Sequence, residues 1–354
     1  MVKRALAGTL TLIALAFAVI FISLVQFDLP REQLIGKYAG GASQFAALPS
    51  GASAHIRDEG NPEGPVLVLI HGSGASLHTW EPWVAELGGS YRIVSMDLPG
   101  HGLTGRVPGD DYSRAAMADF VIEIMDALGI GRFAAGGNSM GGGVSAMIAL
   151  EYPERVSALL LVNSAGIPVE RDQDDVPLAF RLAGMPVISE AMRYVLPRPM
   201  VEEGVKKVFA DQSKVTDEMV ARYFDLTLHE GNRDATRIRF SQDAARDEAA
   251  FAARLGEISA PTLIIWGGKD GLIPVSAAHE FKARIPHADL VIYEHAGHVP
   301  MEEVPEESAG AVAAFLAAAL APGAAEAPVP AGTGPDGAAG EDASGGAMAE
   351  AGSQ

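Results

Sequence analysis

Three side chains suited to nucleophilic catalysis occur along the chain in the order serine, aspartate, histidine. Ser139 lies within the motif GNSMG, between the glycines at 137 and 141. A serine hydroxyl is a weak nucleophile near neutral pH and needs a neighbouring base, which an acid must orient. Asp270 in WGGKDGLIP and His298 in HAGHVPMEEVP supply this acid and this base. The three side chains therefore predict a catalytic triad in which Ser139 is the nucleophile.

The glycine-rich stretch around Ser139 does not match a phosphate-binding loop. The GxxxxGK[ST] loop requires a lysine after its glycines, and a dinucleotide loop requires GxGxxG with an acid further on. Neither pattern is present in GGNSMGGG. A GxSxG motif between a strand and a helix instead predicts a sharp turn that exposes the serine, and its glycines leave room for close backbone contacts.

The elements that position these residues form a predicted α/β fold with a mostly parallel sheet, because short apolar runs alternate with longer helical patterns. We expect strands over 66–72, 91–97, 157–163, 262–268 and 290–294, and helices over 113–128, 141–151, 276–284 and after Pro305. Asp270 and His298 each follow one of these strands, and RFAAGG leads into Ser139, which lies between a strand and the helix at 141–151. Their side chains should therefore project from one edge of the sheet.

A helical insertion over 166–260 separates the two predicted halves of the core, 43–165 and 261–320. It contains amphipathic pieces broken by proline and glycine. An insertion after the carboxyl end of a strand lies over the edge where α/β sheets bind ligands, so it is expected to cap the site. Its methionines are expected to be core residues of the cap or, alternatively, to line an adaptable apolar acyl pocket: Met185, Met192 and Met200.

Acyl chemistry also requires an oxyanion hole, in which two backbone N–H groups bind the negative charge that forms on the substrate carbonyl oxygen. The residue after the nucleophile, Met140, is expected to supply one of them. The loop HGSGAS, which follows the strand at 66–72, is expected to supply the other from Ser73 or, as the alternative, from Gly74.

The motifs HGSGASLHTW, MDLPGHGLT, GNSMGG, WGGKDGLIP and HAGHVPMEEVP resemble successive landmarks of the α/β-hydrolase family. The resemblance covers about residues 50–320. It implies a serine hydrolase of the esterase and lipase type with a helical cap. The GHxP context selects His298 rather than His295 as the base. Supporting or loop-bracing roles are expected for His71, His101 and Asp97.

The preferred reaction is hydrolysis of a carboxylic ester through an acyl-enzyme. Serine at 139 argues against family members with an aspartate nucleophile, such as haloalkane dehalogenases and epoxide hydrolases. GNSMGG and HGSG also resemble hydrolases that cleave carbon–carbon bonds, but HGSGASLHTW lacks the further glycine and proline of their loop. Carbon–carbon bond hydrolysis, lactone opening, acyl transfer and a noncatalytic binding role stay as alternatives, because fold and triad do not determine the substrate.

Composition limits the possible partners. The net charge is −19 and no cluster of lysines and arginines is present, which argues against nucleic-acid binding. The chain contains no cysteine, which excludes disulfides and thiolate metal sites. No metal or organic cofactor is expected, since the triad requires none.

Both ends differ from the core. Residues 5–25 form an uncharged apolar run long enough to cross a bilayer, so we expect 1–30 to be a membrane anchor rather than a cleaved signal peptide. Lys3 and Arg4 precede the run and would keep the N-terminus in the cytoplasm. In a bacterium, this places the catalytic domain in the periplasm, attached to the inner membrane. Residues 321–354 are rich in Ala, Gly and Pro, carry five acids and no base, and predict a disordered tail.

Overall fold

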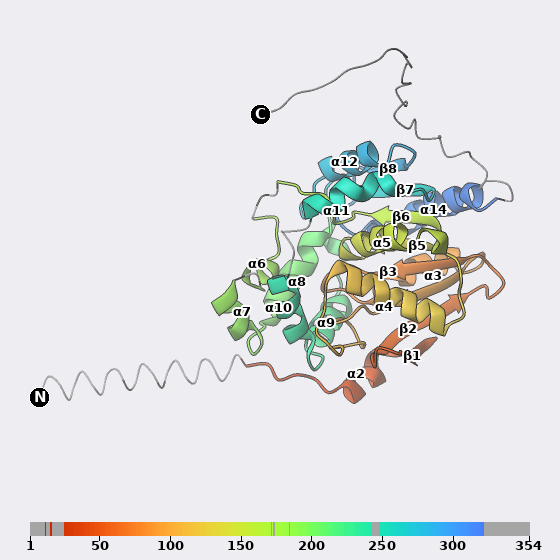
Figure 1. Ribbon diagram of the computed structural model, residues 1–354. Helices are drawn as coiled ribbons and strands as arrows, with labels where there is room; N and C mark the ends of the chain where they lie inside the picture. The colour runs from red at the N-terminus through yellow and green to blue at the C-terminus, as the bar shows by residue number, and fades with distance from the viewer. Residues whose placement is uncertain are drawn as a thin grey trace, which may run out of the picture.

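The computed structural model describes Thr11, Leu15 and residues 25–170, 172, 174–183, 185–242 and 248–321. It contains an eight-stranded sheet with the strand order β1-β2-β4-β3-β5-β6-β7-β8 (Figure 1). The strands are β1 (Ser43–Ala47), β2 (Ser53–Gly60), β3 (Val66–Ile70), β4 (Arg92–Met96), β5 (Phe133–Asn138), β6 (Val156–Val162), β7 (Thr262–Gly267) and β8 (Asp289–Tyr293). In this order, every neighbouring pair from β4 through β3 to β8 is parallel, which confirms the predicted mostly parallel sheet. β1 and β2 add an antiparallel edge that the apolar pattern does not predict.

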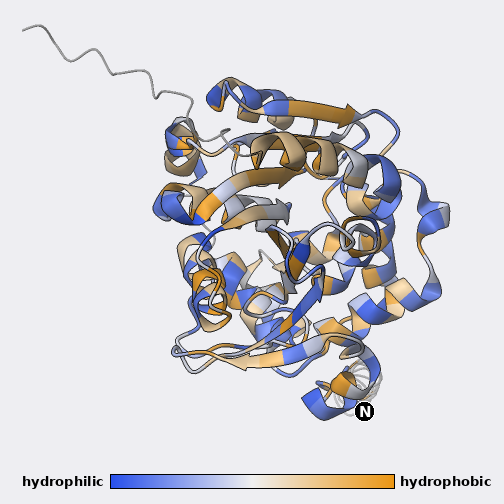
Figure 2. Cartoon of the chain, turned by 90° about the vertical axis from the view of Figure 1, so that its right-hand side faces the viewer, coloured by the Kyte–Doolittle hydropathy of each residue, from blue (hydrophilic) through white to orange (hydrophobic). Residues whose placement is uncertain are grey.

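The central strands are apolar because both of their faces are covered. In β3, Val68 and Ile70 belong to one apolar core, whereas Leu67 and Leu69 belong to another. A strand buried on both sides is expected to be a continuous apolar run rather than an alternating one. In Figure 2 the central strands are mostly apolar along their length, whereas the outer helices carry both polar and apolar residues.

Helices cover both faces of the sheet. α4 (Arg114–Ala127), α5 (Met140–Glu151) and α12 (Ser276–Arg284) contribute side chains to one core, and α3 (Glu81–Leu87) and α14 (Pro305–Ala319) to the other. Shorter helical segments are η1 (Leu77–Trp80), η2 (Pro153–Arg155), η3 (Gln212–Lys214), η4 (Leu255–Glu257) and α13 (Pro300–Glu303). The sheet is therefore the middle of three layers, a framework that holds the loops at its carboxyl edge in place.

Six described helices lie between β6 and β7 in the chain. They are α6 (Leu178–Ala183), α7 (Pro186–Met192), α8 (Arg198–Val208), α9 (Asp217–Thr227), α10 (Asn232–Gln242) and α11 (Glu248–Arg254). α11 buries Phe251 and Ala252 in the core beside α5. α6 to α10 lie together at one side of the sheet (Figure 1), and we refer to these five helices as the cap.

The methionines of this region differ in environment. Met192 and Met200 line a pocket, as one of the two expectations stated. Met185 is 44% exposed, so neither expectation holds for it. It lies immediately before α7, whose other side faces the pocket.

Residues 25–38, the beginning of the first continuous described segment, lie against the cap. Val25 and Leu29 form bridges with Val195 and His229, and the short helix α2 (Arg31–Tyr38) follows. The expected membrane span at 5–25 lies almost wholly outside the described residues, as does the tail at 321–354 except for its first residue. Within the described parts of the chain, no helix combines the length and the apolar character needed to cross a membrane.

Candidate active site

Ser139 occupies a sharp turn between β5 and α5. Its φ is 55°, in the left-handed region that residues other than glycine adopt rarely. A Cβ on Gly137 would lie 2.1 Å from the carbonyl oxygen of Gly141. A Cβ on Gly141 would in turn lie 2.1 Å from the carbonyl oxygen of Ile70, at the end of β3. The two glycines therefore permit the close backbone packing that presents Ser139 at the carboxyl edge of the sheet.

Asp270 and His298 lie together at this edge, after β7 and β8. The Nδ1–H of His298 donates to Oδ2 of Asp270 at 2.7 Å, and both side chains are buried. Oδ1 of Asp270 accepts hydrogen bonds from the backbone N–H groups of Leu272 at 2.8 Å and Ile273 at 2.9 Å. The carboxylate is therefore fixed with one oxygen toward the imidazole. Because Nδ1 is engaged, Nε2 of His298 is the atom left for proton exchange.

Asn163 supports this pair, although the sequence motifs do not identify it. It follows β6, and its Nδ2 donates to Oδ2 of Asp270 at 2.7 Å. Its Oδ1 accepts from the backbone N–H of Gly267 at 3.2 Å. The side chain is fully buried and thus joins the end of β6 to the loop that carries Asp270. The available sequence signal is a single polar residue directly after the apolar run SALLLV.

Two further buried side chains hold the loop that carries His298. Nδ2 of Asn138 donates to the backbone carbonyl of His298 at 2.9 Å. The carboxylate of Glu303 accepts from the N–H of Gly297 at 2.7 Å and from that of Ala210, which follows α8, at 2.9 Å. Burial raises the pKa of Glu303, although these backbone hydrogen bonds oppose the shift. The loop is thus attached to both the sheet and the cap.

Ser139 and His298 line the same pocket. The Ser139 hydroxyl makes no hydrogen bond with any other residue that the structure describes. Catalytic hydrogen bonds are often long without a substrate and shorten in the complex. The structure thus brings the three predicted triad residues to one edge of the sheet, with the Asp270–His298 hydrogen bond already formed.

The predicted oxyanion residues flank the serine. Met140 is the first residue of α5, so its backbone N–H lies at the helix N-terminus, where it lacks a carbonyl partner within the helix. This end of a helix also favours negative charge. Ser73 and Gly74 follow β3, and both line the pocket that contains Ser139.

The cap contacts the loop of Ser73 through Arg239 of α10. One guanidinium nitrogen, Nη2, donates to Oγ of Ser73 at 2.5 Å. Arg239 is only 9% exposed. The two residues are 166 positions apart in the chain, so no local sequence motif predicts their contact. Arg239 is therefore a residue of the site that the sequence analysis misses.

Asp97 braces two loops beside the site, as the sequence analysis expects. Its two carboxylate oxygens accept from the backbone N–H groups of Leu77 and Leu103, each at 2.8 Å. The Nδ1–H of His55 donates to it at 2.6 Å, and both side chains are fully buried. Burial alone would raise the pKa of Asp97, but the hydrogen bond from His55 and the neighbouring histidines hold it well below its usual value.

His71 and His101 lie next to each other below these loops, with ring centroids 5.2 Å apart. Nε2 of His71 accepts from the N–H of Leu98 at 3.0 Å, while Nδ1–H donates to the carbonyl of Gly72 at 2.7 Å. This pattern requires a neutral ring. Burial lowers the pKa of both histidines, to about 3 for His101.

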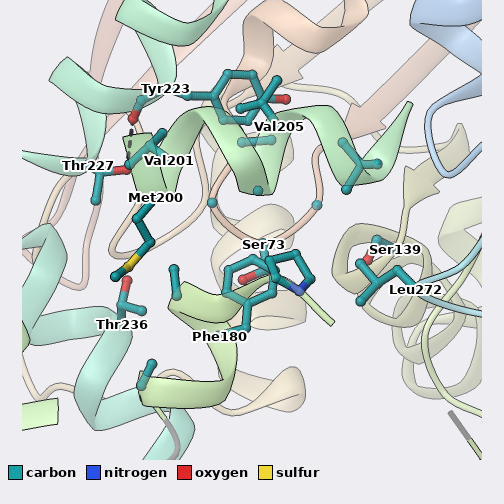
Figure 3. Close-up of a pocket in the computed structure, with 18 of the residues that line it drawn as sticks. Ser73, Ser139, Phe180, Met200, Val201, Val205, Tyr223, Thr227, Thr236 and Leu272 are labelled. Carbon is teal, nitrogen blue, oxygen red and sulfur yellow. Dashed lines mark hydrogen bonds between the residues drawn. The ribbon is translucent and has the colours of Figure 1, made fainter. Parts of the chain in front are cut away.

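The pocket extends from Ser139 beneath the cap. It encloses about 1230 Å³ of empty space, part of it open to solvent, and most of its lining is apolar. Figure 3 shows Ser139 and Leu272 at one end, Phe180 and Val205 between, and Met200, Thr227 and Thr236 at the other end. The shape suits an extended apolar group whose reactive end lies beside Ser139.

Comparisons with known proteins agree with this geometry. A family model for the α/β-hydrolase fold matches residues 65–305. An uncharacterized protein of Mycobacterium tuberculosis is 31% identical over 272 residues, which cover 72% of this chain and 75% of that protein. A 2-hydroxy-6-oxononadienedioate/2-hydroxy-6-oxononatrienedioate hydrolase of Comamonas testosteroni is 28% identical over 252 residues, which cover 69% and 84%. The crystal structure of a bacterial membrane phospholipase A has a TM-score of 0.64 and 27% identity, and the match covers 90% of this chain and 100% of that one.

The family model and the hydrolases among the relatives, together with the mostly parallel sheet, show that the protein is a hydrolase. The chain belongs to the α/β-hydrolase fold family, since the family model matches more than half of its length.

The buried histidines predict that stability decreases in acid. A histidine whose pKa is lowered in the folded state binds its proton only after unfolding, so its stabilising contribution exists above pH 6.5 and is lost as the pH falls. For His101 the loss should extend from about pH 6.5 to about pH 3, at about 1.4 kcal/mol per pH unit at most. Urea midpoints between pH 7.5 and pH 4.5 would measure this loss. A His101→Asn variant should show a smaller pH dependence than the unaltered protein, and an equal pH dependence would contradict this assignment.

Proposed function

We propose that this protein is a serine hydrolase that cleaves carboxylic esters with an apolar acyl group. The observation that carries the proposal is the 2.7 Å hydrogen bond between Asp270 and His298 at the wall of the pocket that also contains Ser139. The positive φ of Ser139 and its place before α5 support its role as nucleophile.

In the proposed reaction, Nε2 of His298 takes the hydroxyl proton of Ser139 while Oγ attacks the ester carbonyl carbon. Asp270 orients the imidazole and stabilises its cation. The N–H groups of Met140 and Ser73 bind the oxyanion of the tetrahedral intermediate. The alcohol then departs with the proton from His298 and leaves an acyl group on Ser139. Water attacks this ester with the same proton transfers and releases the carboxylic acid.

The pocket favours an ester over a doubly charged substrate. The relative from Comamonas testosteroni is named for a dicarboxylate substrate, so carbon–carbon bond hydrolysis is the second candidate. Two arginines line the pocket here, but Arg233 is paired with Asp28 at 2.5 Å and Arg237 with Glu190 at 3.0 Å. Their charges are already balanced by acids, and the remaining lining is mostly apolar. An apolar acyl chain needs no further cation.

Membrane attachment is part of the proposal. The run at 5–25 has the length for one span, and Lys3 and Arg4 precede it. In a bacterial cell the catalytic domain would lie in the periplasm. The membrane phospholipase A matched above supports this proposal, since its match covers 90% of this chain.

The first test is hydrolysis of p-nitrophenyl esters with short to long acyl chains by the full chain in detergent. We expect activity that Ser139→Ala reduces by about a thousandfold or more, because the nucleophile is lost. A serine-reactive phosphonate should label the unaltered protein and not the variant. Full activity in Ser139→Ala would refute the assignment. Phosphonate labelling without ester hydrolysis would favour carbon–carbon cleavage or acyl transfer instead.

Asn163→Ala tests the support of the acid. The change removes a buried donor to the Asp270 carboxylate, and a hydrogen bond to a charged group contributes about 1.5–3 kcal/mol. We therefore expect kcat/KM for the preferred ester to fall about 10- to 100-fold. The control is Asn61→Ala, on the turn between β2 and β3. Unchanged kinetics in a folded Asn163→Ala protein would show that this hydrogen bond does not contribute to catalysis.

Met200→Trp tests the direction of the acyl chain. Met200 lies at the end of the pocket away from Ser139 (Figure 3), so a larger side chain there should fill the distal space. We expect the preference to shift toward shorter acyl chains, with little change for the shortest ester. Steady-state rates over the ester series would measure the shift. An unchanged profile would mean that the acyl chain does not occupy this end.

A further inference from the structure

Exposed large apolar side chains are concentrated on two cap helices and on the segment beside them. Seven large apolar residues are exposed in the described parts of the chain, and five of them lie on α6, near or on α7, or in residues 25–38. We call these five the apolar face: Phe27, Leu178, Met185, Ile188 and Tyr194. The most exposed of them is Phe27, at 83%. Exposed apolar side chains that lie together on a protein surface mark a site of contact with another protein or with a membrane.

The helices below the apolar face have two apolar sides. Phe180 of α6 and Met192 of α7 line the pocket, whereas Leu178 and Ile188 on the same helices are exposed. The two helices pack against each other. A surface helix bathed in water normally carries polar residues on its outer side. The cap here thus separates the pocket from the apolar face by about one helix diameter, roughly 10 Å.

Residues 25–38, which we call the strap, connect this face to the expected membrane span. The N–H of Gln26 donates to the carbonyl of Tyr194 at 2.7 Å, which places the strap beside the end of α7 (Figure 1). Arg233 of α10 donates to Asp28 at 2.5 Å and is itself buried. The start of the strap is therefore tied to two cap helices.

The other end of the strap is tied to α9. The hydroxyl of Tyr38 donates to Asp225 at 2.8 Å, and Lys37 pairs with the same carboxylate at 2.6 Å. Leu34 of α2 is 1% exposed and packs in a small apolar cluster with Leu226 of α9. With contacts at both ends, the strap is held against the cap from Val25 to Tyr38.

We propose that the apolar face lies in the interface of the lipid bilayer, so that the ester enters the pocket beneath the cap from the membrane. This inference rests on the proposed membrane attachment. It deepens the proposed function by naming the substrate class, an ester whose acyl chain resides in a membrane.

The short distance between the expected membrane span and Phe27 favours the bilayer as the partner of the apolar face. The apolar run ends at Val25, and Phe27 follows two residues later. Two residues span at most about 7 Å, which is no more than the depth of one polar interfacial layer of a bilayer. If 5–25 crosses the membrane, Phe27 and the adjoining Tyr194 must lie at its surface. Aromatic and aliphatic side chains are stabilised at that depth.

Tryptophan fluorescence tests the position of the face. The three native tryptophans are fully buried, so a new one on the surface gives a distinct signal. The full chain carrying Ile188→Trp would be reconstituted in phosphatidylcholine vesicles with and without brominated acyl chains. We expect the bromine atoms to quench the new tryptophan. The matched control is Glu280→Trp on α12, beside the sheet edge opposite β1, which should not be quenched. Met185→Trp replaces Ile188→Trp if the latter does not fold.

Each other outcome has a defined meaning. Vesicle flotation without quenching at position 188 would overturn the inference and leave the anchor and the hydrolase function in place. Equal quenching at positions 188 and 280 would overturn the assignment to this face. Protein that fails to float with the vesicles would overturn the anchor, and the inference with it. Because quenching does not require catalysis, none of these results depends on esterase activity.

A kinetic comparison tests the entry of substrate. The double variant Met185→Glu and Ile188→Glu should hydrolyse a long-chain ester embedded in vesicles about tenfold more slowly, the factor that corresponds to loss of contact of one large apolar side chain. Hydrolysis of a short soluble ester should be unchanged, because neither residue lines the pocket. Equal rates of the variant and the unaltered protein on the embedded ester would overturn the inference.

Discussion

The close packing of three backbone segments around Ser139 constrains the rest of the site. β5, the first turn of α5 and the end of β3 approach so closely that no Cβ fits at Gly137 or Gly141. The resulting turn forces Ser139 to a positive φ, a conformation that costs about 1–3 kcal/mol and persists only where the surroundings determine it. Those surroundings are a sheet buried on both faces. The burial of the apolar strands therefore offsets the conformational free energy of the strained turn.

The acid and the base depend on a second set of constraints, formed by buried polar groups. Asp270 uses both carboxylate oxygens, since it accepts from two backbone N–H groups, from Asn163 and from His298. A buried carboxylate would be strongly destabilising without such partners. The same hydrogen bonds that offset its burial also orient it, and they join the loops after β6, β7 and β8. The same hydrogen bonds thus stabilise the charge of Asp270 and position the imidazole of His298.

The sequence identifies the residues that lie in recognisable motifs more readily than the residues that support them. Asp270 and His298 could be placed at one edge because each follows a strand that is recognisable from its own apolar run, and Ser139 is placed there by its GNSMG motif. Asn163 carries no motif, and its role appears only when β6 and β7 are adjacent. Arg239 depends on the orientation of a whole cap helix, which no local pattern determines. The edge strands β1 and β2 are short and partly polar, so their pairing depends on tertiary context.

One helix of the cap, α10, contacts two separate parts of the chain. α10 contacts the strap through Arg233 and the loop of Ser73 through Arg239. These residues are six positions apart, a rise of about 9 Å along an α-helix. Both side chains are largely buried, so the two contacts hold charged groups away from bulk water. The orientation of α10 is therefore set at both ends, by the strap and by the loop beside Ser139. The strap and the loop beside Ser139 consequently contact the same helix.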